Sequence, residues 1–305
     1  MEKTLDKALV QQKDKSTNVR INGTGLTTLF HRGVELLWNV NPDLFKSFLT
    51  EVAFHPKLLK ERPLYREWKN KSESYFVPVK SIDRLVKVYK WKSLENSNEI
   101  ERPVVLLVHG WGGRGLQMNS FIQPLLDKGY DVVTFDAPAH GESTGFSTNF
   151  FEMVESVKTI IEYHQNIDGI VAHSMGCGGV IANLPQFNFI ERVVLIAPHF
   201  DMEHEIKKWA MQTGMSEKMF SELIHHLENK YQKNLSNFNP KNLAKEIESN
   251  VLLIHDMDDK PCSYKNSVKL KEKIPNVELM LTSKFGHFRI IKEKSIVDKT
   301  VKFFK

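Results

Sequence analysis

The chain has 305 residues, of which 41% are apolar and 26% are charged. This mixture is that of an ordinary globular protein, so it excludes collagen-like, low-complexity and wholly disordered chains, while the length suits two small domains or one large one. The net charge of +5 resides in residues 1–103, which hold 19 basic and 13 acidic side chains, whereas the remainder is balanced at 23 against 24. Since neither a basic face on the core nor a nucleic-acid-reading motif is visible, we expect no nucleic-acid partner.

Cysteine usage and apolar run lengths indicate the compartment. Two cysteines, Cys177 and Cys262, cannot build a disulfide framework in a chain of this length, and the start MEKTLDKALVQQKDKSTN carries charges where a signal peptide needs an apolar segment. The longest apolar run beside a predicted strand, Val104–Val108, is far shorter than the roughly 20 residues that span a bilayer. We therefore expect a cytoplasmic protein without a transmembrane segment.

Before residue 75 the chain has the pattern of an arm followed by helices. Residues 1–25 are polar and lysine-rich without periodicity, and we expect a mobile arm to which we assign no function. Residues 26–74 carry two apolar stripes at helical spacing, which predict two packed helices in an N-terminal helical extension. Such stripes also suit peripheral contact with a membrane surface, although packing within the protein is the commoner arrangement. The stripes are Leu29, Phe30, Val34, Leu37 and Trp38, then Leu44, Phe45, Phe48, Leu49 and Val52.

Residues 75–305 have the pattern of one α/β domain. Short apolar runs punctuated by glycine and proline alternate with helical patterns such as Phe151–His164. Strands that are apolar throughout must be buried on both faces, which predicts a mostly parallel central sheet with helices on both faces. Residues 199–249 contain only helix signals, so we expect a helical insertion there. The clearest strand runs are Val104–Val108, Val132–Phe135, Ile170–Ala172, Val193–Ala197, Val251–Ile254 and Val277–Leu281.

Ser174 stands at a predicted strand-to-helix turn. The strand Ile170–Ala172 runs directly into His173-Ser174-Met175-Gly176, whose small residues permit a sharp turn. At such an elbow the hydroxyl projects beyond the end of the sheet, and the N–H of Met175 points with the helix N-terminus toward developing negative charge. Ser174 is therefore the candidate nucleophile, with an ordinary glycine-rich turn or a phosphate-gripping loop as the competing interpretation.

A second loop at the same predicted edge supplies a candidate oxyanion donor. The sequence His109-Gly110-Trp111-Gly112-Gly113 follows the strand Val104–Val108, and its backbone can approach a ligand closely. A serine nucleophile needs two amide donors, so the N–H of Trp111 is the candidate second donor beside that of Met175. We interpret the His109 side chain as packing within the turn.

A base and an acid follow Ser174 in the chain. His287 follows the strand Val277–Leu281 and is the candidate acceptor of the Ser174 proton. Carboxylates after strand ends at the same edge could orient its imidazole, and the pattern leaves the choice among them open. The candidates are Asp256, Asp258 and Asp259, with Asp201 after a different strand as the outside alternative.

In this order the segments resemble the α/β-hydrolase superfamily over roughly residues 75–305. In that family the carboxylate usually stands four residues after the histidine of the acid segment, so the resemblance selects Asp259. Ala172 and Asp256 depart from the pattern, because each replaces a glycine that is usual in the family. The matching segments are His109–Trp111 for the oxyanion loop, Asp136–Ser143 for the loop after the following strand, Ala172–Gly176 for the nucleophile elbow, Ile254–Asp259 for the acid segment and Phe285–Phe288 for the histidine segment.

The resemblance implies a serine hydrolase, esterase-like, that forms an acyl-enzyme on Ser174, with His287 as base and Asp259 as orienting acid. Its substrate would be a small acyl compound. The alternatives are a carbon–carbon bond hydrolase or a thioesterase with the same triad, and a non-catalytic ligand-binding protein on the same fold. The insertion occupies the family's lid position, where apolar residues either line an acyl pocket or pack together: Phe200, Trp209, Met211, Met215, Met219 and Phe220.

The remaining histidines and cysteines are interpreted as structural. His140 lies in a tight loop rich in proline and glycine, and strand alternation turns the side chain of His173 away from that of Ser174. Cys177 is expected to pack on its helix. No Cys/His group has zinc spacing, so we expect no metal, and triad chemistry requires no cofactor. The oligomeric state is left open by the sequence.

Overall fold

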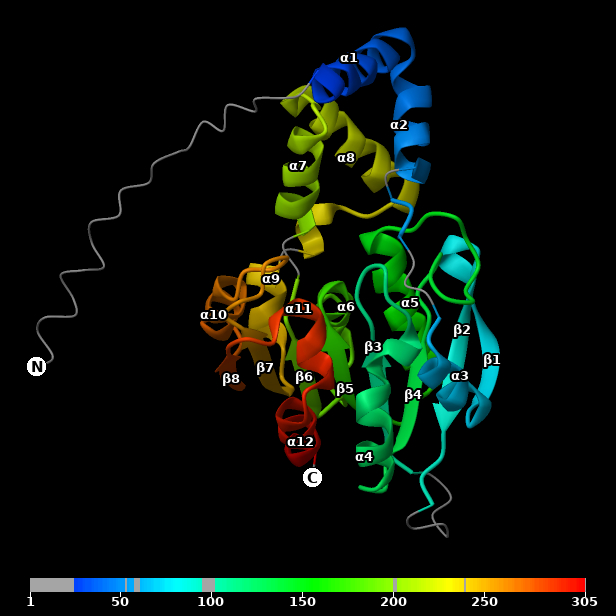
Figure 1. Ribbon diagram of the computed structural model, residues 1–305, viewed down its shortest axis with the longest axis vertical. Helices are drawn as coiled ribbons and strands as arrows, with labels where there is room; N and C mark the ends of the chain where they lie inside the picture. Colours follow the sequence, from blue (N-terminus) through cyan, green and yellow to red (C-terminus); the bar gives the residue numbers. More distant parts are fainter. Residues whose placement is uncertain are drawn as a thin grey trace, which may run out of the picture.

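The computed structural model describes residues 25–52, 54–57, 61–94, 102–199, 202–238 and 240–304. An eight-stranded sheet with the order β1-β2-β4-β3-β5-β6-β7-β8 forms its centre (Figure 1). The pairs β1–β2 and β2–β4 are antiparallel, and the remaining neighbours are parallel. The strands are β1 (Glu73–Val79), β2 (Arg84–Trp91), β3 (Val104–Val108), β4 (Asp131–Phe135), β5 (Ile167–His173), β6 (Arg192–Ile196), β7 (Asn250–Asp256) and β8 (Val277–Thr282).

Helices cover both faces of this sheet and form a separate cap at one end (Figure 1). Short 3₁₀ turns join several of them, including η2 (Gly115–Phe121). The α-helices are α1 (Gly25–Val40), α2 (Pro42–Val52), α3 (Pro63–Asn70), α4 (Ile122–Leu126), α5 (Phe150–Tyr163), α6 (Met175–Ile181), α7 (Met202–Gln212), α8 (Glu217–Tyr231), α9 (Pro240–Leu243), α10 (Lys265–Lys271), α11 (Gly286–Arg289) and α12 (Lys294–Phe303).

The central strands are mostly apolar, and both of their faces are buried. Every residue of β3 and β4 is buried. Alternate residues of β3 contribute to two different cores: Leu106 packs in the cluster that includes α5 and α6, and Leu107 packs in the cluster that includes α4 and α12. The six predicted strand runs coincide with strands of the sheet, except that Ala197 lies just beyond the end of β6, and the mostly parallel α/β architecture is confirmed.

The antiparallel pair β1–β2 and the short helix α3 are additions to the predicted elements. β1 exposes alternate residues toward its end, so its apolar signal is weaker than that of the central strands. α3 has only eight residues, of which Tyr65 is buried and Trp68 packs against the same core, so it offers too few apolar positions for a clear helical pattern. The expected domain boundary at residue 75 falls inside β1. Apart from Gly25, the expected arm of residues 1–25 lies outside the described residues.

The two predicted N-terminal helices, α1 and α2, pack against the helices α7 and α8 of the insertion (Figure 1). Val34 and Phe45 share a hydrophobic cluster with Leu223, and the Lys46 ammonium lies 3.6 Å from the Glu222 carboxylate. The N-terminal extension and the insertion therefore build one helical cap.

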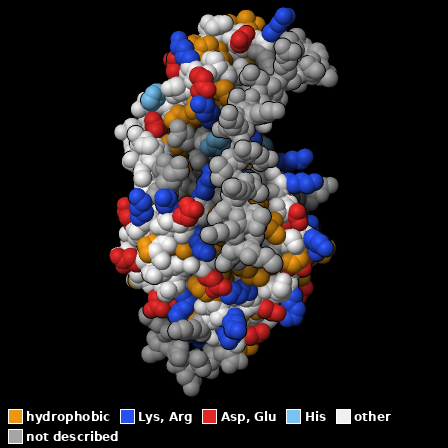
Figure 2. Space-filling model, turned by 90° about the vertical axis from the view of Figure 1, so that its left-hand side faces the viewer, with side chains coloured by type: hydrophobic (Ala, Val, Ile, Leu, Met, Phe, Trp, Pro, Cys, Tyr) orange, Lys and Arg blue, Asp and Glu red, His pale blue; other side chains and the backbone are white. Residues whose placement is uncertain are grey.

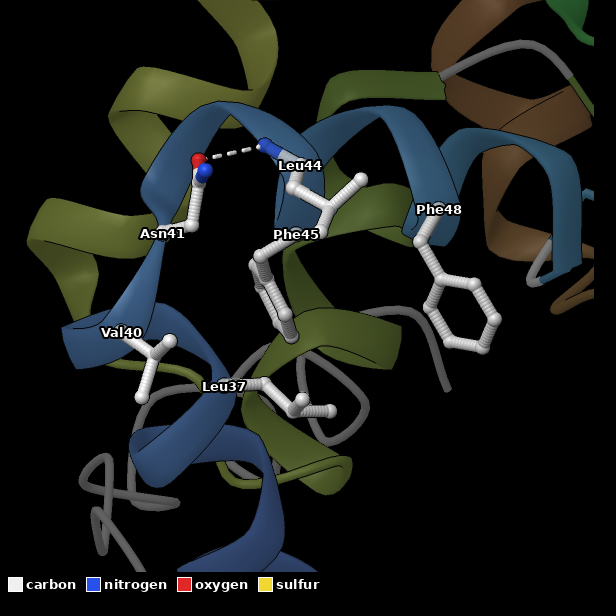
Figure 3. A pocket seen from close by; sticks show the side chains of 6 residues that line it. All are labelled: Leu37, Val40, Asn41, Leu44, Phe45 and Phe48. Carbon is white, nitrogen blue, oxygen red and sulfur yellow. Dashed lines mark hydrogen bonds between the residues drawn. The ribbon is translucent and has the colours of Figure 1, made fainter.

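An apolar groove runs along the outer side of this cap at the corner between α1 and α2 (Figure 3). It encloses about 240 Å³. Its one polar lining side chain, Asn41, accepts the backbone N–H of Leu44 at 2.9 Å and so caps α2. The lining residues thus offer no titratable group for chemistry; they are Leu37, Val40, Asn41, Leu44, Phe45 and Phe48.

The charge of the surface and the lengths of the helices concern two expectations from the sequence, that the protein has no nucleic-acid partner and no transmembrane segment. Figure 2 shows acidic and basic side chains interspersed over one face of the molecule. Among the described residues, no helix has both the length and the apolar character that crossing a membrane requires.

Candidate active site

The parallel strands bring four loops to one edge of the sheet. β3 pairs with β5 through Val108 and Ala172, and β7 pairs with β8 through Asp256 and Thr282, so the segments that follow these strands all leave at their carboxyl ends. This is the edge at which open α/β sheets bind ligands. The oxyanion-like loop, Ser174, the aspartates and His287 therefore converge there.

Ser174 occupies a strained elbow between β5 and α6. Its backbone has φ 55° and ψ −124°, a region that residues with a side chain seldom adopt. Two glycines, Gly176 and Gly110, allow the chain to pack closely around this elbow. A β-carbon at residue 176 would lie 2.5 Å from the carbonyl oxygen of His109, and one at residue 110 would lie 2.7 Å from Cβ of Ser174. The glycines permit the start of α6 and the loop after β3 to lie against each other.

Ser174, His287 and Asp259 form one hydrogen-bonded chain. His287 Nε2 lies 2.8 Å from Ser174 Oγ, and His287 Nδ1 lies 2.7 Å from Asp259 Oδ2. The first pair is 113 residues apart in sequence and the second is 28 apart. All three side chains are buried, with 6% of Ser174, 7% of His287 and 8% of Asp259 exposed. The arrangement suits proton transfer from the hydroxyl to an imidazole that a carboxylate orients.

Asp259 is held in its ionised form. Burial opposes ionisation, but hydrogen bonds from His255, His287 and the backbone N–H of Cys262 outweigh it and keep the pKa of Asp259 below its ordinary value. A carboxylate that stays charged at this position can stabilise an imidazolium beside it.

The other candidate aspartates contact the loop that carries His287. Asp256 Oδ2 accepts hydrogen bonds from the Thr282 hydroxyl at 2.8 Å and from the Phe285 N–H at 3.1 Å. Asp258 Oδ2 accepts the Lys284 N–H at 2.8 Å. Asp256, which replaces a usual glycine, therefore ties β7 to the histidine loop. Asp201 lies outside the described residues.

The candidate oxyanion donors lie on either side of Ser174. Met175 is the first residue of α6, so its N–H has no acceptor within the helix. Trp111 lies in the turn that the Gly113 N–H closes onto the Gly110 carbonyl at 3.1 Å, and Gly110 packs against Ser174. Their donation to an oxyanion stays a prediction.

His109 and His140 hold this turn with both of their ring nitrogens. His109 Nδ1 lies 2.7 Å from the Gly110 carbonyl, while its Nε2 accepts the Ala137 N–H at 2.9 Å. His140 Nδ1 lies 2.9 Å from the Pro138 carbonyl, while its Nε2 accepts the Gly112 N–H at 2.9 Å.

These contacts need neutral rings. Burial lowers the pKa of His109 to about 3 and that of His140 to about 4. These contacts agree with the prediction that the side chains of His109 and His140 have structural roles.

The N-terminal extension also reaches this loop. A β-carbon at Gly112 would lie 3.1 Å from the carbonyl oxygen of Lys57, and the Thr148 N–H donates to the Phe54 carbonyl at 3.1 Å. Residues 54–57, between α2 and α3, therefore border the candidate site, which the sequence pattern did not indicate.

The apolar residues of the insertion pack more than they line a space. Met215, Met219 and Phe220 are buried in the hydrophobic cluster that includes α1 and α2, and Met211 packs against it. Phe200 and the side chain of Trp209 are not among the parts of the chain that the structure describes.

Possible metal ligands and thiols are the other groups that bear on the chemistry of the described residues. In the part of the chain that the structure describes, no three His, Cys, Asp or Glu side chains are grouped to hold a metal ion. Cys177 is buried on α6, and burial raises the pKa of its thiol well above the ordinary value.

Known proteins share this architecture. A family model described as alpha/beta hydrolase fold matches residues 103–222, whereas no curated protein sequence matches the chain. An esterase from Pyrococcus furiosus is similar in structure, with 20% identity and a TM-score of 0.58 over 82% of this chain and 97% of that one. Est1E from Butyrivibrio proteoclasticus has 12% identity and a TM-score of 0.59 over 75% and 96% of the two chains. A serine hydrolase involved in carbazole degradation has 14% identity and a TM-score of 0.54 over 76% and 98%.

Proposed function

This chain has the α/β-hydrolase fold, and from that premise we propose that it is a serine hydrolase of the esterase type, acting on a small acyl substrate. One observation carries the proposal: Ser174 Oγ, the His287 ring and the Asp259 carboxylate lie in a continuous hydrogen-bonded chain, with Ser174 on a strained elbow. Structural likeness at these identities supports the fold alone, whereas the proposed chemistry rests on the residues of the site.

Acylation is the first half of the proposed reaction. His287 Nε2 takes the proton of Ser174 as Oγ attacks the carbonyl carbon, and Asp259 stabilises the imidazolium that forms. The N–H groups of Met175 and Trp111 donate to the oxyanion of the tetrahedral intermediate. His287 then gives its proton to the departing alkoxide, so an alcohol leaves and the acyl group stays on Ser174.

Water completes the cycle. His287 removes a proton from a water molecule, whose oxygen attacks the acyl carbon, and a second tetrahedral intermediate collapses to release the acid. The proton returns to Ser174 Oγ.

Labelling with a fluorophosphonate probe tests the proposal directly. An activated serine reacts with the probe, and peptide mapping should locate the adduct on Ser174. The variant Ser174→Ala should keep its fold and lose about 10⁴-fold or more in kcat on short p-nitrophenyl esters. Undiminished turnover in this variant, or an adduct on another residue, would refute the proposal.

A further inference from the structure

Two buried histidines flank the Ser174–His287–Asp259 chain and have no part in the reaction proposed above. His173 is 2% exposed and His255 is fully buried. Each directs a ring nitrogen at a different member of the chain, His173 at the backbone of His287 and His255 at the carboxylate of Asp259.

His173 holds the base. Its Nε2 lies 2.8 Å from the backbone carbonyl oxygen of His287, and because a carbonyl only accepts, this nitrogen carries the hydrogen. Burial lowers the pKa of His173 to about 3, so the ring is a neutral donor. Its neighbour Ser174 contacts the other end of the same histidine at 2.8 Å. The last residue of β5 and the residue that follows it thus contact His287 at its backbone and at its ring, which sets the distance between the imidazole and the hydroxyl.

His255 holds the acid. Its Nε2 lies 3.0 Å from the Cys262 carbonyl and 3.3 Å from Asp259 Oδ2, so one N–H is shared between two acceptors. In the neutral ring, Nδ1 then accepts the hydroxyl hydrogen of Ser267, 2.7 Å away. Asp259 Oδ1 takes the Cys262 N–H at 2.8 Å. His255 therefore links the turn that contains Asp259 and Cys262 to Ser267 of α10. It also fixes which oxygen of Asp259 faces His287.

We propose that His173 and His255 are positioning residues of this site: His173 sets where the His287 imidazole stands relative to Ser174, and His255 sets the orientation of the Asp259 carboxylate. The inference rests on the proposed function, because it concerns the efficiency of the same three residues. Misplacing a reacting group by about 1 Å costs on the order of 100-fold in rate. Loss of either histidine should therefore lower kcat far more than it changes KM.

The test compares leucine and glutamine at both positions. Leucine removes the donor, whereas the glutamine side-chain nitrogen reaches the place of Nε2 and keeps it. We expect His173→Leu and His255→Leu to lower kcat on a p-nitrophenyl ester by about 10-fold to 100-fold. KM should change far less. His173→Gln and His255→Gln should recover a large part of the loss.

His164 provides the matched control. It is a buried histidine whose Nε2 lies 3.0 Å from the Tyr75 hydroxyl, and it precedes β5, so it lies at the opposite edge of the sheet from Ser174. His164→Leu should lower the melting temperature and leave kcat unchanged. The inference is overturned if both active-site leucine variants keep the wild-type kcat, if glutamine recovers nothing, or if His164→Leu loses as much kcat.

A spectroscopic measurement keeps the inference testable apart from turnover. In wild-type protein labelled with ¹⁵N-histidine, His173 and His255 should carry hydrogen on Nε2. The strongly deshielded Nδ1–H proton of His287, which faces Asp259, should disappear in His255→Leu and persist in His255→Gln. Hydrogen on Nδ1 of both rings, or an unchanged His287 signal in His255→Leu, would overturn the positioning roles. Failure of wild-type labelling by the fluorophosphonate would instead refute the proposed function.

Discussion

Gly176→Ala places one methyl group where the start of α6 meets the end of β3. The new β-carbon would lie 2.5 Å from the His109 carbonyl oxygen and 2.9 Å from both the Val108 carbonyl oxygen and Val108 Cγ1. Two of these three atoms belong to the backbone, which cannot rotate away as a side chain does. α6 and the loop after β3 must therefore separate by about 0.9 Å to reach ordinary contact distances.

Both stability and rate should report this displacement. Overpacking a well-packed interior costs about 1–3 kcal/mol, which corresponds to a fall in Tm of several degrees in a chain of this size. The same shift moves Ser174 and the Met175 N–H away from the loop that carries Trp111, so kcat should fall by about 10-fold to 100-fold. Thermal unfolding and p-nitrophenyl ester kinetics on the same preparation measure the two effects.

Gly33→Ala is the matched control for this prediction. Gly33 lies in α1, and a β-carbon there would meet nothing within 4 Å. Since alanine favours a helix over glycine by up to about 1 kcal/mol, this variant should be as stable as the wild type or slightly more so, with an unchanged kcat. A Gly176→Ala variant that keeps both the wild-type Tm and the wild-type kcat would refute the close-packing argument for the elbow.

Two further predictions concern stability. Burial lowers the pKa of His109 and His173 to about 3 and that of His140 to about 4. The contribution of these three neutral rings to the free energy of unfolding is therefore complete above about pH 6.5 and is lost as the pH falls toward 4. Each should lower the free energy of unfolding by about 1.4 kcal/mol per pH unit in that window, and urea titrations that give the same value at pH 7 and pH 5 would contradict this. The Tyr231 hydroxyl donates to the buried Glu152 carboxylate at 2.9 Å, so Tyr231→Phe should cost about 1–3 kcal/mol while leaving kcat on a short ester unchanged. Equal urea midpoints for this variant and the wild type would show that the hydroxyl contributes little.

Local patterns predicted the parts of the site that depend on a few adjacent residues. The elbow at Ser174 follows from a buried strand that ends against small residues, and His287 follows from its place after the last strand. The choice of Asp259 among neighbouring aspartates came from family resemblance, because spacing along the chain does not say which carboxylate meets an imidazole 28 residues away. In the structure Asp256 bonds instead to the loop that carries His287.

The histidines beside the site show where a local pattern stops being informative. Alternation along β5 predicts a His173 side chain turned away from that of Ser174, whereas in the structure both side chains contact His287, and nothing in the sequence places His173 against the His287 backbone. His255 stands four residues before Asp259, and their contact depends on the turn that brings the Asp259 carboxylate back within 3.3 Å of the ring. In the sequence, His173 and His255 are visible only as histidines close to the better-recognised Ser174 and Asp259.

The order of apolar strands and helices was enough to determine the α/β architecture, because a strand without polar residues has to be covered on both faces wherever it is placed. Which segments distant in the sequence contact one another was determined only by the tertiary structure. Three features depend on surfaces that exist only once the sheet is formed. They are the pairing of the weakly apolar β1 and β2, the packing of α1 and α2 against the insertion, and the contacts of Phe54 with Thr148 and of Lys57 with Gly112. Contacts of that kind come from the shape of the assembled core rather than from the spacing of residues along the chain.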